Sequence, residues 1–187
     1  MAETVSGSAK VAHSLTVGEG FVNPLGFHDA GPVFSWKLPE VVQRQTAYQI
    51  EVRDGNSALL WDSGLVESEQ STRVRYGGPT PRSRDRIAWR VRFRDENGVE
   101  SGWSDDARLE MGLLSAQDWA AQWIRPAADS NTDKEPVAWL RRSFSAKKAA
   151  RARIYVTARG VFDIQLNGTR VGRDHFALSG HGILLPE

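Results

Sequence analysis

Carboxylates are the side chains of this chain that could carry out acid–base chemistry. Two of them can hydrolyse a glycosidic bond when they stand about 5–5.5 Å or about 6.5–9.5 Å apart across it. The candidates are Asp62, Asp95, Glu96, Glu100, Asp105, Asp106 and Asp118. Nearly all of them fall in predicted turns, where an Asp side chain accepts hydrogen bonds from backbone N–H groups. None lies in a recognisable cleft motif, so the sequence assigns no catalytic residue.

Motifs for metals, cofactors and nucleophiles are also missing from the sequence. The histidines are His13, His28, His175 and His181. No two of them have the i, i+4 spacing of a helical zinc site, and the chain has no cysteine. There is no Gly-x-Ser-x-Gly elbow, and the Gly18-Glu19-Gly20 run is too short for a phosphate-binding loop. We therefore expect no metal and no cofactor.

Arginines are concentrated in one region of the chain. Eight lie between Arg73 and Arg94, against the single acid Asp85, and such a cluster raises nucleic-acid binding as an alternative. However, Arg90, Arg92 and Arg94 alternate with apolar residues, and solvation of one strand face explains that spacing. The net charge of +1 gives no general attraction to nucleic acid or to an anionic membrane. We expect neither partner.

The seven tryptophans have two competing interpretations. Exposed aromatic rings can stack on sugars, whereas core and interface packing is their more common use. Trp89 alternates with apolar neighbours and is expected in the core, and Trp119 with Trp123, four residues on, is expected to pack two domains together. The candidates for sugar contact are Trp36, Trp61, Trp103, Trp119, Trp123 and Trp139.

Short β-strands are the elements that would position these side chains. Residues 44–53 and 87–95 alternate apolar and polar side chains, which is the period of a half-buried strand. Asp54-Gly55-Asn56 and Asn97-Gly98 predict hairpin turns after them. No segment has a sustained helical period, and we expect one helical turn at most, over 116–121. Short strands at this spacing are typical of a β-sandwich.

Length and composition fit an all-β chain with two domains. A chain of 187 residues with 40% hydrophobic content can bury a core in one large or two small domains. We predict a fibronectin type III-like or immunoglobulin-like sandwich over 1–114 and a junction and linker over 115–136. The start of a second, jelly-roll-like β-sandwich follows over 137–187. This second sandwich is expected to be incomplete, because so few strands do not close one.

The second domain has its own predicted strands. They cover 137–144, 151–158 and 162–166, and Asn167-Gly168 then forms a hairpin turn. The Asn167-Gly168-Thr169 tripeptide also fits a glycosylation sequon, but the turn is the simpler explanation. A half-built sandwich would expose strand edges such as 154–156. We therefore expect dimerisation, strand exchange or disorder beyond about Pro136.

The first twenty residues have no apolar signal region, and no stretch approaches the roughly 18 apolar residues of a membrane span. Together with the absence of cysteine, these features favour a cytoplasmic location.

Seven short motifs follow one another in a fixed order through the first 114 residues. They are Asn23-Pro24-Leu25-Gly26, Phe34-Ser35-Trp36, Gln45 to Ile50, Leu60 to Gly64, Trp89-Arg90-Val91, Ser101 to Ser104 and Glu110 to Leu114. In this order they resemble the N-terminal region of bacterial α-L-rhamnosidases, family 78 of the glycoside hydrolases. The resemblance continues through Asp118-Trp119 and Gln122 to Ile124 into the motif from Leu166 to Gly172, and it covers about residues 20 to 172.

The resemblance implies a fold and a role. Such enzymes begin with a fibronectin type III-like sandwich, continue with a second β-sandwich and carry their catalytic carboxylates far downstream, in a helical domain. No catalytic residue can be carried over, and residues 173–187 lack the Pro-Gly-Trp-Thr segment that usually follows the Asn-Gly hairpin. The resemblance therefore implies a non-catalytic, accessory fragment of an inverting α-L-rhamnosidase. Its implied partners are the downstream domains, and a rhamnoside is a candidate ligand.

Two alternatives remain open on the residues alone. The chain could be a free-standing β-sandwich module that binds carbohydrate or protein. A complete small hydrolase is the other alternative, but it would require a carboxylate pair that the sequence does not reveal.

Overall fold

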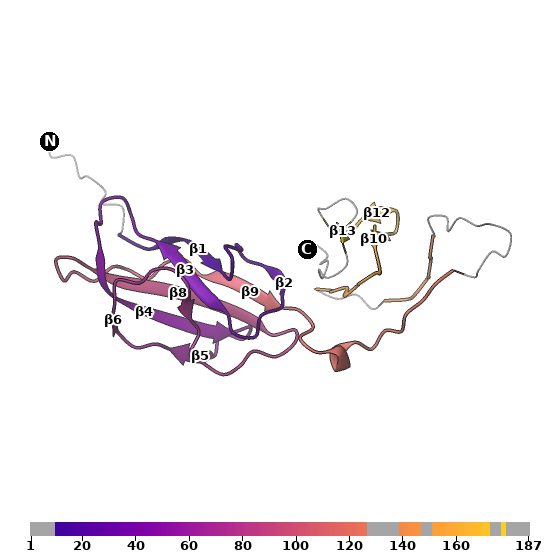
Figure 1. The fold of residues 1–187 in the computed structure, drawn as a ribbon, viewed down its shortest axis with the longest axis horizontal. Helices are drawn as coiled ribbons and strands as arrows, with labels where there is room; N and C mark the ends of the chain where they lie inside the picture. Colours follow the sequence, from indigo (N-terminus) through magenta and orange to yellow (C-terminus); the bar gives the residue numbers. More distant parts are fainter. Residues whose placement is uncertain (1–9, 127–138, 147–150, 173–176, 179–187) are drawn as a thin grey trace.

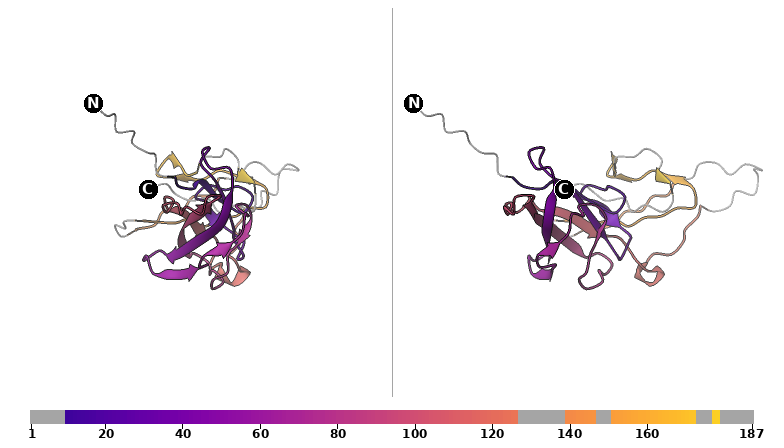
Figure 2. Two further views of the ribbon diagram at one scale, coloured as in Figure 1. Left: turned by 90° about the vertical axis from the view of Figure 1, so that its left-hand side faces the viewer. Right: turned by 60° about the vertical axis from the view of Figure 1, so that its left-hand side comes forward.

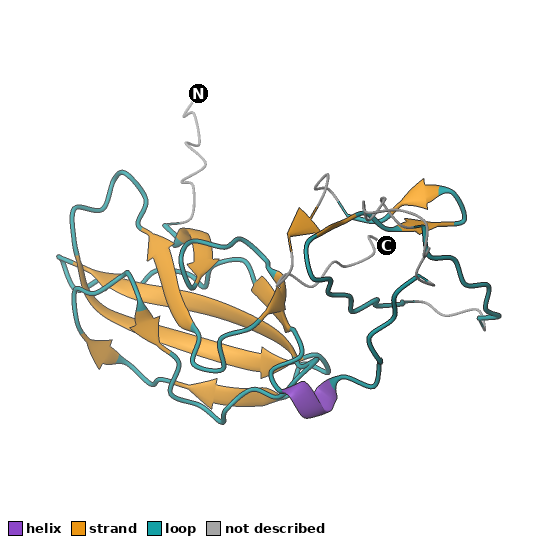
Figure 3. Ribbon diagram, turned by 45° about the vertical axis from the view of Figure 1, so that its right-hand side comes forward, coloured by secondary structure: helices purple, strands orange, loops and turns teal. Residues whose placement is uncertain are grey.

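The computed structural model describes residues 10–126, 139–146, 151–172 and 177–178. Residues 10–114 form two β-sheets that pack face to face, and the later described residues form a smaller β unit beside one end of them (Figure 1). A single turn of 3-10 helix, η1 (Ala116–Asp118), follows the sandwich (Figure 3). The prediction of an all-β chain is therefore confirmed.

The larger sheet holds most of the long strands. Its order is β2 (Leu25–Phe27), β9 (Ala107–Met111), β8 (Arg86–Asp95), β4 (Gln45–Asp54) and β5 (Leu59–Asp62), and β6 (Val66–Glu67) also pairs with β4. All of these pairs are antiparallel except β2–β9, which is parallel. Residues distant in sequence therefore meet at the β2–β9 edge.

The smaller sheet has three strands. Its order is β1 (His13–Val17), β3 (Val33–Lys37) and β7 (Val74–Arg75), and both pairs are antiparallel. Figure 2 shows the two sheets of the sandwich from two further directions.

Aromatic side chains from the two sheets meet in the core. The period of two in β8 buries Ile87, Trp89, Val91 and Phe93 on one face, as the sequence predicts. Phe34 of β3 stacks on Trp89 with ring centroids 4.3 Å apart. This contact joins the two sheets, so Trp89 is an interior residue.

The two predicted hairpin turns of the sandwich are present, and an Asp carboxylate accepts backbone hydrogen bonds in each of them. The Asp54 carboxylate accepts hydrogen bonds from the N–H groups of Asn56 and Ala58, at 2.8 and 2.9 Å. Asp95 does the same in the second turn, where the N–H groups of Asn97 and Val99 both donate over 2.9 Å. An Asp at the end of a strand thus fixes each turn.

The smaller unit contains less strand than its sequence pattern predicts. The segments 139–144 and 151–158 have no regular strand. The paired strands are β10 (Val161–Phe162) with β13 (Ala177–Leu178), and β11 (Gln165–Leu166) with β12 (Thr169–Arg170). An alternating segment becomes a strand only beside another strand, and the described residues supply none for 139–144 and 151–158.

The predicted turn at Asn167-Gly168 is confirmed. Asn167 and Gly168 have φ values of 50° and 81°, and they connect β11 to β12.

Candidate functional site

Most of the carboxylates that the sequence offers for catalysis make structural contacts. Asp62 accepts hydrogen bonds from the Gly64 N–H and the Gln49 side chain, each at 2.8 Å. Glu96 accepts from the Arg44 N–H, and Glu100 forms an ion pair with Arg92 at 3.3 Å. Asp105 and Asp106 are exposed. The contacts give Asp62, Glu96 and Glu100 structural roles.

No metal centre is built by the residues that the structure describes. Within them, no three His, Cys, Asp or Glu side chains are close enough to hold an ion. The His13 Nε2 atom lies 3.2 Å from the carbonyl oxygen of Leu38, and the His28 ring packs against Phe27. His175 and His181 lie outside the described residues. Nor does any helix in the described ranges have the length and apolarity to cross a membrane.

The spacing of the arginines in β8 predicts side chains that are solvated. In the structure, these side chains also contact other residues. The guanidinium groups of Arg90 and Arg92 lie 4.5 and 5.1 Å from the ring of Trp103. Arg90 is also paired with Glu51 at 2.7 Å, and Arg92 donates to Gln49 at 2.9 Å. Both side chains are half-buried. The outward face of β8 is therefore a network whose cations already have partners.

Two of the tryptophans proposed for sugar contact are occupied in packing. Trp36 is only 2% exposed and donates its ring N–H to the Gln45 side chain at 3.1 Å, which agrees with core packing, the more common of the two interpretations. Trp61 packs edge-on against Tyr76, with ring centroids 5.3 Å apart.

The tryptophans after residue 115 are less enclosed. Trp119 is half-buried, whereas Trp123 is 65% and Trp139 is 84% exposed. Trp123 lies 5.2 Å below the guanidinium of Arg159. Trp123 therefore contacts Arg159 of the smaller unit while most of its ring is exposed, and the packing of Trp119 and Trp123 between two domains stays a prediction.

A buried ion pair joins the sandwich to the smaller unit. Arg153 holds Glu110 of β9 through two hydrogen bonds, from Nε to Oε1 at 2.7 Å and from Nη2 to Oε2 at 2.9 Å. The two side chains are only 16% and 8% exposed. Such a two-pronged arginine–carboxylate contact fixes both orientation and distance. Glu110 lies between the buried Leu109 and Met111, and the contact with Arg153 explains how a charged residue is buried there.

Arg84 adds a second set of contacts at the same place. Its guanidinium lies 5.4 Å from the ring of Tyr155 and donates to the carbonyl oxygen of Asp118 at 3.1 Å. Burial raises the pKa of the Tyr155 hydroxyl, and the nearby Glu110 carboxylate raises it further. We call Arg84, Glu110, Asp118, Arg153 and Tyr155 the junction cluster.

The chain segment that connects the two units is held in place locally. The Asp118 carboxylate accepts from the Ser115 N–H at 3.1 Å and contacts the Ser83 hydroxyl, completing a capping box on η1. The Ser83 hydroxyl in turn accepts from the Leu114 N–H at 2.7 Å. The first residues after the sandwich are therefore fastened to the loop before β8.

Sequence reasoning missed the junction cluster. Its one visible signal is Glu110, a carboxylate placed between the apolar Leu109 and Met111 at the end of a strand. The partner Arg153 is 43 residues away, and only the fold brings the two together.

A protein-family comparison decides which family the sandwich represents. Residues 12–115, more than half of the chain, match the model of the Rha78A-like, N-terminal immunoglobulin domain. The chain belongs to this family. The match agrees with the immunoglobulin-like fold and with the resemblance to the N-terminal region of α-L-rhamnosidases.

Curated relatives of this family member are much longer proteins. An α-L-rhamnosidase of Alteromonas sp. (strain LOR) is 46% identical over an aligned length of 172 residues, and the match covers 83% of this chain and 18% of the relative. An α-L-rhamnosidase of Formosa agariphila is 40% identical over an aligned length of 179 residues, and the match covers 87% of this chain and 19% of the relative. The chain thus spans about a fifth of the length of either relative.

Solved structures of α-L-rhamnosidases also match this chain over a small part of their own length. The Streptomyces avermitilis α-L-rhamnosidase complexed with L-rhamnose matches with a TM-score of 0.59 and 37% identity, over 64% of this chain and 12% of the other. The native enzyme from Aspergillus terreus matches with a TM-score of 0.59 and 25% identity, over 84% of this chain and 19% of the other.

Proposed function

We propose that this chain is the N-terminal, non-catalytic part of an α-L-rhamnosidase, and that its sandwich holds the next β unit in place for the domains downstream. The relatives named above support the rhamnosidase assignment. The observation that carries the holding role is the contact between Glu110 and Arg153.

The physical reason is the strength and geometry of that contact. A buried carboxylate is costly unless it is paired, and removal of one partner from a buried pair costs on the order of 3–5 kcal/mol. Glu110 is on a strand of the sandwich, whereas Arg153 belongs to the smaller unit. Docking of the smaller unit therefore completes the environment of Glu110, and undocking leaves its charge without that partner.

The Glu110→Gln variant tests the holding role. Gln keeps the shape of the side chain and removes its charge, so we expect faster proteolysis across 151–158. The melting temperature of the sandwich should change little. The matched control is Glu67→Gln, because Glu67 pairs with Arg94 and is 69% exposed. Proteolysis across 151–158 at the rate of the unaltered chain would contradict the holding role.

Hydrolysis of a chromogenic α-L-rhamnoside tests the assignment as non-catalytic. The purified 187-residue chain should give no turnover. Turnover that persists through repurification would show that a catalytic carboxylate pair exists in this chain.

A chimera tests the link to rhamnosidase activity. In it, this chain replaces the corresponding N-terminal part of the Alteromonas relative, to which it is 46% identical. We expect the chimera to hydrolyse the rhamnoside and its Glu110→Gln form to inactivate at a lower temperature. An inactive, well-folded chimera would contradict the proposal.

A further inference from the structure

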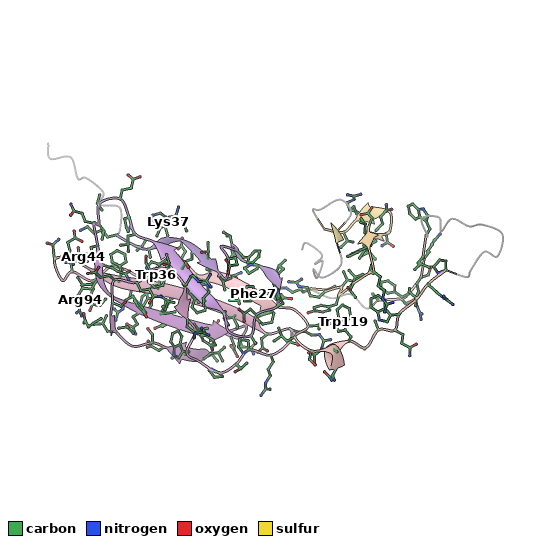
Figure 4. The ribbon with its side chains drawn as sticks, viewed as in Figure 1. Phe27, Trp36, Lys37, Arg44, Arg94 and Trp119 are labelled. Carbon is green, nitrogen blue, oxygen red and sulfur yellow. The ribbon has the colours of Figure 1, made fainter. Side chains whose placement is uncertain are left out.

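A groove of about 340 Å³ lies at one end of the sandwich. It is formed by the loop between β1 and β2, the loop between β2 and β3, and the residues of β7. Phe27, one of its lining residues, lies at the end of the sandwich beside the smaller unit (Figure 4). The volume falls in the lower range of sites that bind small molecules.

The groove is lined by two arginines and two acidic residues, together with His28. Arg73 and Arg75 supply guanidinium N–H groups, and Glu19 and Asp29 supply carboxylate oxygens. Arg73 is paired with Glu19 at 3.0 Å, and both are exposed. The side chain of Arg75 is exposed and, among the described residues, has no hydrogen bond or ion pair, although its backbone pairs with Val33. Its donors are therefore available to a ligand.

The groove is also preformed. The N–H of Gly18 donates to the carbonyl oxygen of Val33 at 2.9 Å, and Val17 and Phe21 exchange two backbone hydrogen bonds of 3.0 Å. Arg73 has a φ of +53°, in the left-handed region that residues other than glycine rarely adopt, and its N–H donates to the Ser35 hydroxyl at 2.9 Å. Strain of this kind gathers at ligand-binding positions.

We propose that this groove binds a neutral saccharide unit. Sugar hydroxyls donate and accept, so they can use the guanidinium groups and the carboxylates together. The half-exposed ring of Phe21 supplies an apolar wall for the C–H face of a pyranose. The carboxylates of Glu19 and Asp29 balance the charges of Arg73 and Arg75, so the groove offers an anionic ligand no net attraction.

Saccharide binding in the groove is a separate proposal from the role of the sandwich in holding the next β unit. An experiment can contradict one of the two proposals and leave the other intact. Saccharide binding here needs no hydrolysis and does not involve the junction cluster.

The experiment is an NMR titration of the 187-residue chain with L-rhamnose, methyl α-L-rhamnoside and, as a charged probe, glucuronate. We expect saturable shifts with the two neutral sugars at the backbone amides of Phe21, Gly31 and Arg75. Glucuronate should bind more weakly.

Two variants locate the site. A methyl group added at Gly31 would lie 3.6 Å from Asp29 Oδ1 and 3.9 Å from Arg75 Nη1, so Gly31→Ala keeps ordinary contacts while it fills the space between donor and acceptor. We expect it to weaken saccharide binding about tenfold or more, and Arg75→Gln to weaken binding about tenfold. The matched control is Arg82→Gln, which removes the same charge from another exposed position and should leave the affinity unchanged.

Three results would overturn the proposal. The first is the absence of saturable shifts at those amides with either neutral sugar. The second is tighter binding of glucuronate than of the neutral sugars, which would make the groove an anion site. The third is unchanged affinity in both Gly31→Ala and Arg75→Gln.

Discussion

Asp95 shows how one buried carboxylate organises its surroundings. It is 2% exposed at the end of β8, where it accepts from the N–H groups of Val99 and Asn97 and lies 3.5 Å from the ammonium group of Lys10. The hydrogen bond from Val99 is the main cause that holds the pKa of this carboxyl below its usual range. Burial acts in the opposite direction, and the Asn97 N–H and Lys10 assist Val99.

The lowered pKa of Asp95 predicts a dependence of stability on acid. Because the folded state holds the proton less tightly than the unfolded state does, the contribution is complete above the ordinary Asp pKa of about 4. It is lost as the pH falls through the lower, folded-state pKa. Urea unfolding between pH 7 and pH 2 measures it. Asp95→Asn should flatten this part of the profile, whereas Asp105→Asn, at an exposed site, should not. Parallel profiles for Asp95→Asn and the unaltered chain would contradict this reading.

Trp89 is the residue whose truncation should damage the sandwich most directly. It is 1% exposed and stacks on Phe34, so Trp89→Ala leaves a cavity between the two sheets. We expect a loss of about 3–5 kcal/mol in the free energy of unfolding, measured in urea. Trp139→Ala is the control, because Trp139 is 84% exposed, and its unfolding curve should stay close to that of the unaltered chain. Equal losses in the two variants would contradict the core position of Trp89.

At the scale of elements, residues 101–104 continue the sheet without being a strand. The N–H groups of Ser101 and Ser104 donate to the carbonyl oxygens of Phe93 and Val91, at 2.7 and 2.9 Å. Their hydroxyls accept the N–H groups of the same two β8 residues, at 2.9 and 3.1 Å. Serine oxygens thus occupy places that strand carbonyl groups would fill.

This arrangement predicts a local cost when a hydroxyl is removed. Ser104→Ala leaves the buried N–H of Val91 without its acceptor, which should reduce stability by about 1–3 kcal/mol. Hydrogen exchange should show faster exchange of the Val91 amide in particular. Ser71→Ala is a suitable control, because the hydroxyl of Ser71 has no hydrogen bond within the described structure. Val91 protection that survives the substitution would refute this account.

The elements differ in how far the sequence predicts them. Alternation identifies β4 and β8, and Asp-Gly or Asn-Gly signals locate their turns, because both depend on neighbouring residues. The pairing of β8 with residues 101–104 depends on side-chain hydrogen bonds, which have no period. The same limit applies to the sites. Glu110 with Arg153, and the groove residues Asp29 and Arg75, come together only through the fold.

At the scale of the whole molecule, the two units differ in how well they cover their apolar side chains. The sandwich encloses a continuous aromatic core. In the part after residue 115, large apolar side chains are exposed by half or more. They are Trp123, Ile124, Trp139, Leu140, Phe144 and Val161. Exposed apolar groups of this size in one region favour contact with another surface.

We expect the isolated chain to self-associate through this region, as its exposed strand-like segments also predict. Sedimentation velocity over a range of concentrations measures the association. The double variant Trp139→Ser, Phe144→Ser should shift the distribution toward monomer. Its control is Val41→Ser, Leu59→Ser, which changes two side chains that are 71% and 57% exposed on the sandwich. A chain that stays monomeric at every concentration would contradict this prediction.

The parallel pairing of β2 with β9 sets an order of events during synthesis. Leu25 and Phe27 are made early, yet the residues that they pair with, Glu110 and Met111, leave the ribosome more than eighty residues later. Contacts this distant in sequence slow folding, and until β9 emerges the part of the β8 edge from Arg86 to Trp89 has no neighbour on that side. The nascent sandwich therefore completes its larger sheet only after β9 has been made. Because Glu110 belongs to that last strand, docking of the following unit on Glu110 comes after the sheet is complete.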